Sequence, residues 1–170
     1  EDQDLGDQLT NIVKKLYSIA KKDNLDFHKL WLDNVPKMII QNDIVKKYAI
    51  KSSPYIIDPV IGEYDNPRAQ KQGPVSLDLT HRGNTAIFGT TGCGKTTLLS
   101  TMLYSIIINN PPSDVNLYII DFGAEKLKMF SKAPQVGEVL VPDDKNKIHY
   151  LFSMMENEIL KRTKYFAQNS

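Results

Sequence analysis

The chain contains 170 residues, of which 41% are hydrophobic, so it can bury a substantial core and we expect a folded domain rather than a disordered segment. Its 21 basic and 20 acidic residues give a formal net charge of +1, and only three of the basic residues are arginines, so no nucleic-acid partner is expected. The single cysteine excludes an internal disulfide framework and favours a reducing, cytosolic location. The apolar runs are too short to span a bilayer, so we expect this chain by itself to be soluble.

Residues 1–80 are predicted to form an N-terminal amphipathic helix and a small β-layer. Apolar residues from Leu9 to Ala20 recur at helical spacing with lysines largely opposite them, and we expect this helix to pack on its own domain rather than on a membrane or a partner. We interpret four residues after it as a packing anchor: Phe27, Leu30, Trp31 and Leu32. The remaining predictions are strands at 38–40, 55–57, 60–61 and 75–79, a short helix at 44–48 and a turn at 63–67.

The stretch Gly89–Thr96 fits the phosphate-binding loop pattern G-x-x-x-x-G-K-[ST]. A β-prone run, Thr85–Phe88, precedes it, and Lys95–Asn109 after it has apolar residues at helical spacing. The order of strand, loop and helix that such a loop requires is therefore predicted. The alternative is a glycine-rich turn with an exposed lysine.

Each residue type in the loop suits a polyphosphate bound with magnesium. Glycines let the backbone turn tightly and direct its N–H groups at phosphate oxygens, and the helix N-terminus adds partial positive charge. Lys95 would reach the β- and γ-phosphates, and the Thr96 hydroxyl would bind Mg²⁺. We therefore predict ATP and Mg²⁺ as ligands, with these candidate residues: Gly89, Thr90, Thr91, Gly92, Cys93, Gly94, Lys95, Thr96 and Thr97.

The residues after this helix predict a parallel α/β unit. Leu117–Ile120 is a continuous apolar run, typical of a strand buried on both faces, and Val136–Val141 is predicted to be another strand. Between them Glu125–Phe130 is predicted as a short helix. Asp143 or Asp144 can cap a long final helix, whose predicted apolar stripe is Ile148, Leu151, Phe152, Met155, Ile159 and Phe166.

Asp121 ends the first of these strands, and its role has two interpretations. Four apolar residues followed by Asp have the form of a Walker B strand, which would place this carboxylate near Mg²⁺. Alternatively the carboxylate caps the following turn through Gly123, which is the interpretation we favour. The triplet Asp121–Gly123 also matches a magnesium-binding motif of protein kinases, but no kinase catalytic-loop motif accompanies it.

Four groups of residues resemble the FtsK/SpoIIIE ATPase family, in particular the tandem ATPase domains of EssC-type motors of type VII secretion. They are Gly83–Asn84, Gly89–Thr97, Leu117–Gly123 and Ala133–Gly137, and the likeness extends upstream through Trp31–Leu32 and Asp65–Pro67. In place of Cys93 the family commonly has a serine.

The resemblance implies a RecA-like P-loop NTPase fold and cytoplasmic ATPase domains in a parent anchored in the bacterial cell membrane. It implies neighbouring ATPase domains, a hexamer as one assembly of the parent, and secreted helical-hairpin proteins as substrates. It also implies that the Walker B acids lie on a later strand, so residues 81–170 would be the leading half of an ATPase domain and no catalytic residue is assigned. We expect the chain to bind ATP without efficient hydrolysis. A non-hydrolysing docking module and a DNA translocase are the alternatives.

Overall fold

The computed structural model describes residues 7–25 and 32–169, which fall into two compact units. The first unit consists of residues 1–34 with 66–71, and the second of residues 35–65 with 72–170. The second unit contains the phosphate-binding loop pattern, so the architecture of that unit decides how the candidate site is built.

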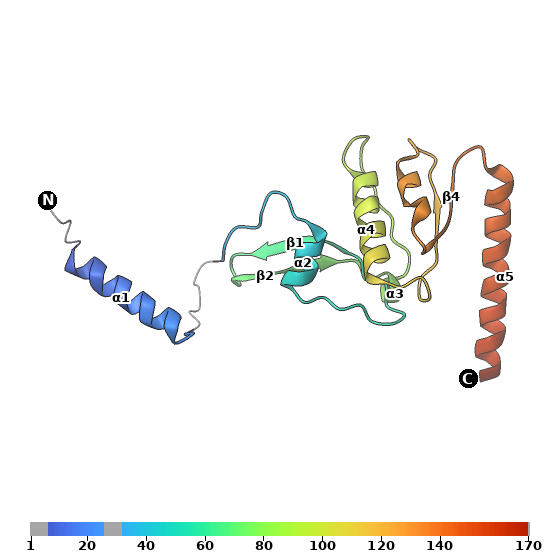
Figure 1. Ribbon diagram of the computed structural model, residues 1–170. Helices are drawn as coiled ribbons and strands as arrows, with labels where there is room; N and C mark the ends of the chain where they lie inside the picture. Colours follow the sequence, from blue (N-terminus) through green and yellow to red (C-terminus); the bar gives the residue numbers. More distant parts are fainter. Residues whose placement is uncertain (1–6, 26–31, 170) are drawn as a thin grey trace. The chain divides into compact units, whose positions relative to one another are not determined.

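The described residues of the first unit include the helix α1 (Gln8–Lys22), which confirms the amphipathic helix predicted there (Figure 1). The Asp7 carboxylate caps it by accepting a hydrogen bond from the Leu9 N–H at 3.4 Å. Its apolar side chains, such as Leu9 and Leu16, are exposed, and their packing on the rest of the chain stays a prediction. In the predicted anchor, Phe27, Leu30 and Trp31 lie outside the described residues, whereas Leu32 is exposed.

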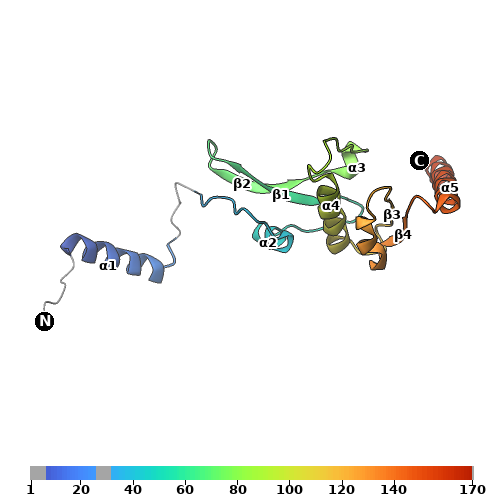
Figure 2. The same ribbon diagram turned by 90° about the horizontal axis from the view of Figure 1, so that it is seen from above.

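Helix α2 (Gln41–Lys47) follows, and then the two-stranded sheet of β1 (Val60–Asn66) and β2 (Lys71–Ser76) (Figures 1 and 2). These elements belong to the second unit except for Asn66 and Lys71, the sheet residues next to the connecting turn. The predicted helix at 44–48 and the strands near 60 and 75 are therefore confirmed, with shifted ends. The strand β2 ends at Ser76, because a short helix, α3 (Leu79–Arg82), begins soon after it. The Asp78 carboxylate caps this helix by accepting a hydrogen bond from the His81 N–H at 2.9 Å.

Three local predictions in this region were wrong. Residues 38–40 are not a strand, because Ile40 takes the N-cap position of α2. Residues 55–57 are not a strand either: Tyr55 has a left-handed φ of 64°, and the Ile56 N–H bonds back to the Ser53 carbonyl in a turn. The turn predicted at 63–67 begins only at Pro67, because β1 remains in its sheet through Asn66.

Side chains of two helices fix the first residue of β1 in place. The Val60 N–H donates to the buried Ser105 hydroxyl at 2.9 Å, and the Val60 carbonyl accepts from the Gln41 amide at 2.8 Å. Farther along β1, Glu63 accepts hydrogen bonds from Lys47 and Tyr48 at the end of α2. Both backbone groups of a buried strand residue are thus paired outside any β-ladder, which avoids the cost of an unsatisfied polar group.

The rest of the unit consists of α4 (Lys95–Asn109), β3 (Leu117–Ile120), the 3₁₀ helix η1 (Lys126–Lys132), β4 (Val136–Leu140) and α5 (Lys145–Asn169). All five match predicted elements, and β3 and β4 pair in parallel, with Ile119 opposite Val139. In both views α4 lies close to these strands (Figures 1 and 2). Its Leu103 packs with Ile119, Leu127 and Val136 in a buried apolar cluster.

The structure corrects the prediction of a strand at Thr85–Phe88. The segment pairs with no strand in the described part of the chain, and the Phe88 side chain is 89% exposed. Because a strand is defined by its hydrogen-bonded neighbour, a β-prone sequence without a partner remains extended chain.

Burial of β3 and of the final helix is also less complete than predicted. Tyr118 on β3 is exposed, so this strand is not buried on both faces. In α5 only Leu151 of the predicted stripe is buried, whereas Phe152, Ile159 and Phe166 are exposed. Asp144 precedes α5 as predicted, and its carbonyl accepts from the Ile148 N–H at 3.0 Å. Its carboxylate accepts from the Val141 N–H and pairs with Lys147 of α5 at 3.6 Å.

Candidate functional site

The backbone of the loop at 89–94 favours glycine at two of its three glycine positions. Gly92 and Gly94 have left-handed φ angles of 83° and 93°, which side-chain-bearing residues rarely adopt. At Gly89, where φ is not left-handed, a Cβ would lie 2.5 Å from the Cys93 sulfur, so a larger residue there would require the exposed Cys93 side chain to move. The Cys93 N–H closes the turn on the Thr90 carbonyl at 3.4 Å. The predicted tight turn is confirmed.

Lys95 begins α4, and its side chain folds back over the loop that precedes it. Its Nζ donates to the carbonyls of Gly89 and Thr90, at 2.8 and 2.7 Å, and lies 4.0 Å from the Cys93 sulfur. The α4 helix starts with no side-chain cap at Gly94, and the first N–H groups of a helix have no partner within it. An ammonium group and free backbone donors are therefore concentrated at one end of α4, where an anion would be stabilised.

A cavity of about 290 Å³ lies at this end of the helix. Six of the nine predicted residues line it, from Thr91 to Thr97 without Cys93, while Gly89 and Thr90 hold the Lys95 ammonium and Cys93 is exposed beside them. Lys126, from η1, is the remaining lining residue, and sequence reasoning missed it. Nothing in the loop pattern could have revealed Lys126, because its approach depends on how the chain turns after β3.

Asp121 does not line this cavity. One carboxylate oxygen accepts from the Gly123 N–H at 2.9 Å and the other from the Leu127 N–H at 3.2 Å, and the residue is only 8% exposed. The predicted cap through Gly123 is therefore present, and the same carboxylate also accepts from Leu127 in η1. Glu125 is also absent from the cavity lining, and its carboxylate pairs with Lys128 at 3.3 Å.

The residues present fit a magnesium ion that is held mainly by phosphate and water. Over the described ranges 7–25 and 32–169, no group of three His, Cys, Asp or Glu side chains could hold a metal by itself. Mg²⁺ in nucleotide sites keeps several waters and takes few protein ligands, and Thr96 in the lining carries a suitable hydroxyl. The donor set thus suits a metal that arrives with its nucleotide.

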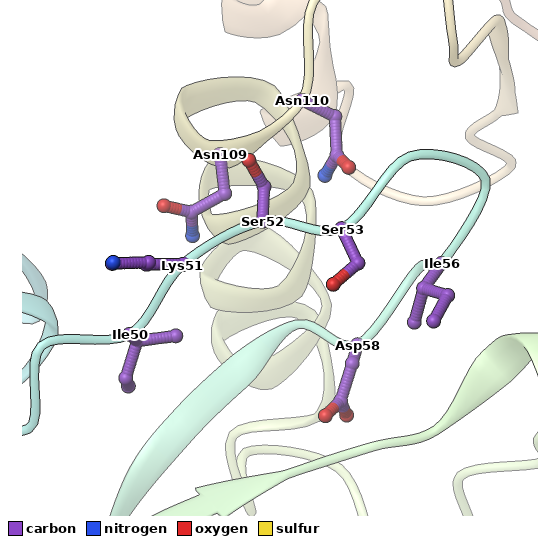
Figure 3. Close-up of a pocket in the computed structure, with 8 residues that line it drawn as sticks. All are labelled: Ile50, Lys51, Ser52, Ser53, Ile56, Asp58, Asn109 and Asn110. Atoms are coloured by element: carbon purple, nitrogen blue, oxygen red, sulfur yellow. The ribbon is translucent and has the colours of Figure 1, made fainter.

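A second cavity, of about 150 Å³, lies where the loop before β1 passes the C-terminal end of α4 (Figure 3). Its lining includes Lys51, Asp58, Asn109 and Asn110. The Asp58 carboxylate accepts from the Ser76 hydroxyl, and the Asn109 and Asn110 amides donate to groups of α4. The Asp58, Asn109 and Asn110 side chains therefore bond within the fold, and the cavity is smaller than the one at the loop.

A comparison with protein families matches the FtsK/SpoIIIE family over residues 49–170, which is more than half of the chain and includes the whole loop. The chain belongs to the FtsK/SpoIIIE family. The predicted resemblance is thereby confirmed, as is the α/β P-loop fold class.

Relatives and solved structures of this FtsK/SpoIIIE chain come from type VII secretion. The type VII secretion system protein EssC of Staphylococcus aureus (strain NCTC 8325) is 27% identical over 165 residues, 95% of this chain and 11% of EssC. The ESX secretion system protein YukB of Bacillus subtilis is 31% identical over 104 residues, 61% of this chain and 7% of YukB. The chain thus spans only about a tenth of the length of these relatives.

Two solved structures show the same fold. ATPases 2 and 3 of EssC from Geobacillus thermodenitrificans match with a TM-score of 0.65 and 26% identity, over 81% of this chain and 25% of that one. ATPases 2 and 3 of Thermomonospora curvata EccC, in complex with a signal sequence peptide, match with a TM-score of 0.62 and 28% identity, over 68% and 21%. None of the helices described in this FtsK/SpoIIIE chain is long and apolar enough to cross a membrane.

Proposed function

We propose that this chain binds Mg-ATP at its phosphate loop and works as part of a type VII secretion motor. The observation that carries the proposal is the geometry of the loop. Three glycines, two of them with a left-handed φ, lead into α4. Lys95 lies over the loop beside a cavity that six of the residues from Thr91 to Thr97 line, Cys93 being the exception. This arrangement supports a polyphosphate as the ligand, and membership of the FtsK/SpoIIIE family supports ATP in particular.

The candidate ligand residues are those predicted from the loop pattern. Backbone N–H groups from Gly92 to Thr97 would surround the phosphates, Lys95 would turn from the loop carbonyls to the β- and γ-phosphates, and the Thr96 hydroxyl would hold Mg²⁺. A bound Mg²⁺ supplies charge neutralisation of the phosphates. Gly89, Thr90 and Cys93 would shape the loop from outside the cavity.

The proposal extends to the longer protein in which such a chain would operate. The relatives support neighbouring ATPase domains in the same parent. We place that parent at the cytoplasmic face of the bacterial cell membrane, with secreted helical-hairpin proteins as its substrates and a hexamer as its assembly. Residues 1–80 would form the N-terminal helix and β extension, and residues 81–170 the leading half of an ATPase domain.

Hydrolysis should need residues that the described cavity does not contain. Phosphoryl transfer requires a positioned water and stabilisation of developing charge, and no carboxylate of the described residues lines the cavity. We therefore expect the 170-residue chain to bind Mg-ATP and to release phosphate negligibly. Sustained phosphate release from the pure chain, abolished by Lys95→Ala, would contradict this expectation.

A second candidate function is a docking module that ATP stabilises without turnover. The observation that favours it is the use of Asp121 and Glu125 in local contacts instead of at the cavity. Steady-state phosphate release by the intact parent separates the two functions, because a motor would turn over ATP and a docking module would not. The DNA translocase alternative is disfavoured by the near-neutral charge, and salt-dependent DNA binding would be its mark.

A further inference from the structure

Lys126 approaches the phosphate loop from a different element. It is the first residue of η1, and it lines the same 290 Å³ cavity as Lys95 and the N-terminus of α4. Within the described part of the chain, its ammonium group forms no hydrogen bond or ion pair. The neighbouring Lys128, by contrast, pairs with Glu125 at 3.3 Å and is not part of the cavity lining. Two nearby lysines therefore have different surroundings.

The backbone around Lys126 is anchored by the residue that follows it. On one side Glu125 has a left-handed φ of 53°, which turns the chain into η1. On the other side Leu127 is 3% exposed within the apolar cluster and donates its N–H to the Asp121 carboxylate at 3.2 Å. Because Leu127 is anchored in the core, the fold sets the backbone position from which Lys126 approaches the cavity.

We propose that Lys126 is a second phosphate-binding cation of this site, acting with Lys95 on the polyphosphate of Mg-ATP. This inference rests on the proposed function, because it needs the nucleotide in the loop. A lysine carries a compact charge on a flexible stem, which suits reaching a phosphate across a cavity.

The charges around the cavity favour an anion between the two lysines. Lys95 and Lys126 both line it, the N-terminus of α4 adds partial positive charge, and no acidic residue of the described chain is in the lining. Like charges on two lysines that line one cavity repel each other, and an anion bound between them would offset that repulsion. Lys126 also has no partner among the described residues to give up on binding, so its attraction to phosphate is not offset by a broken ion pair.

Calorimetric titration of the full chain with Mg-ATP tests the proposal through three variants. Lys126→Ala should weaken binding about fivefold, the upper range for a solvent-exposed ion pair. Lys126→Arg should retain most of the affinity, because it keeps the charge. The matched control Lys128→Ala should bind like the wild type, because that side chain does not line the cavity.

A salt series and thermal unfolding separate a phosphate contact from a structural effect. The difference between wild type and Lys126→Ala should shrink between about 0.1 M and about 1 M salt, since screening weakens exposed charge pairs. The unfolding temperature of Lys126→Ala without nucleotide should equal that of the wild type, because the Lys126 side chain is exposed. Equal affinities of wild type and Lys126→Ala, with Lys95→Ala impaired, would overturn the role of Lys126 alone. A wild type that fails to bind ATP would overturn the proposed function and this inference together.

Discussion

The Asp121 carboxylate accepts a hydrogen bond from the Gly123 N–H at 2.9 Å, and its second oxygen accepts from the Leu127 N–H at 3.2 Å. The first donor lies in the turn that follows β3, and the second lies in η1 itself. A carboxylate used in this way stabilises the turn and the placement of Lys126, so the Walker B form of Leu117–Asp121 does not require a metal-binding role for Asp121.

Removing the Asp121 carboxylate should therefore lower stability more than nucleotide affinity. In Asp121→Ala two backbone N–H groups lose their acceptor, one of them on the buried Leu127, which should cost about 1–3 kcal/mol of unfolding free energy. Asp121→Asn keeps one acceptor oxygen and should lose less. Chemical denaturation without nucleotide measures the loss, and titrations with and without Mg²⁺ measure affinity. A magnesium-dependent affinity loss as large as that of Lys95→Ala, at unchanged stability, would restore the Walker B role.

Ser105 should contribute to stability through the start of β1. The residue is fully buried and its hydroxyl accepts from the Val60 N–H, so Ser105→Ala leaves a buried donor unsatisfied, at a cost of about 1–3 kcal/mol. Ser100→Ala on the same helix is the control, because its hydroxyl only bonds back to the Thr96 carbonyl and both changes alter helix propensity equally. Urea denaturation compares them. Equal unfolding free energies for the two variants would contradict the role of Ser105.

Glu63 should make stability fall on acidification. Hydrogen bonds from Lys47 and then from Tyr48 lower the pKa of this carboxyl below its ordinary 4.5, and its side chain is only 3% exposed. Because the folded pKa is lowered, the contribution is fully present above pH 4.5 and is lost as pH falls through the folded pKa. Thermal unfolding of wild type and Glu63→Gln from neutral pH downward tests this. Parallel pH profiles of the two proteins would contradict it.

Cys93 should react with alkylating reagents, and nucleotide should protect it. The residue is exposed, its sulfur lies 4.0 Å from the Lys95 Nζ, and it precedes the N-terminus of α4. Phosphates bound at the loop would block access to the sulfur. Alkylation rates measured with and without saturating Mg-ATP decide the matter, with AMP, which lacks the β- and γ-phosphates, as the control. Rates that do not change with Mg-ATP would contradict protection.

Sequence reasoning succeeded where structure is decided locally. The α4 helix was predicted at its observed bounds, because its apolar residues recur at helical spacing. Gly94 marks where the helix starts, and the pair Asn110–Pro111 marks where it ends. The cap at Gly123 was likewise predictable, since an Asp bonding two residues ahead is a local contact.

Sequence reasoning failed where the outcome depends on distant partners. Thr85–Phe88 has the composition of a strand, but pairing is a non-local property, and no described strand lies beside it. Lys126 reaches the cavity only because of the turn after β3, which a pattern centred on Gly89–Thr96 does not contain. The exposed stripe of α5 follows the same rule: periodicity predicts an apolar face but not what covers it.

The central claim is that Mg-ATP binds at the loop with Lys95 on its phosphates, and calorimetric titration of wild type and Lys95→Ala tests it most directly. A charge-assisted contact to phosphate contributes about 1.5 to 3 kcal/mol, so the variant should bind more than about tenfold more weakly. Thermal unfolding without nucleotide checks that the variant is folded. Wild-type binding with more than tenfold weakening in Lys95→Ala is the result that the structure predicts, and equal affinities of two folded proteins would contradict it.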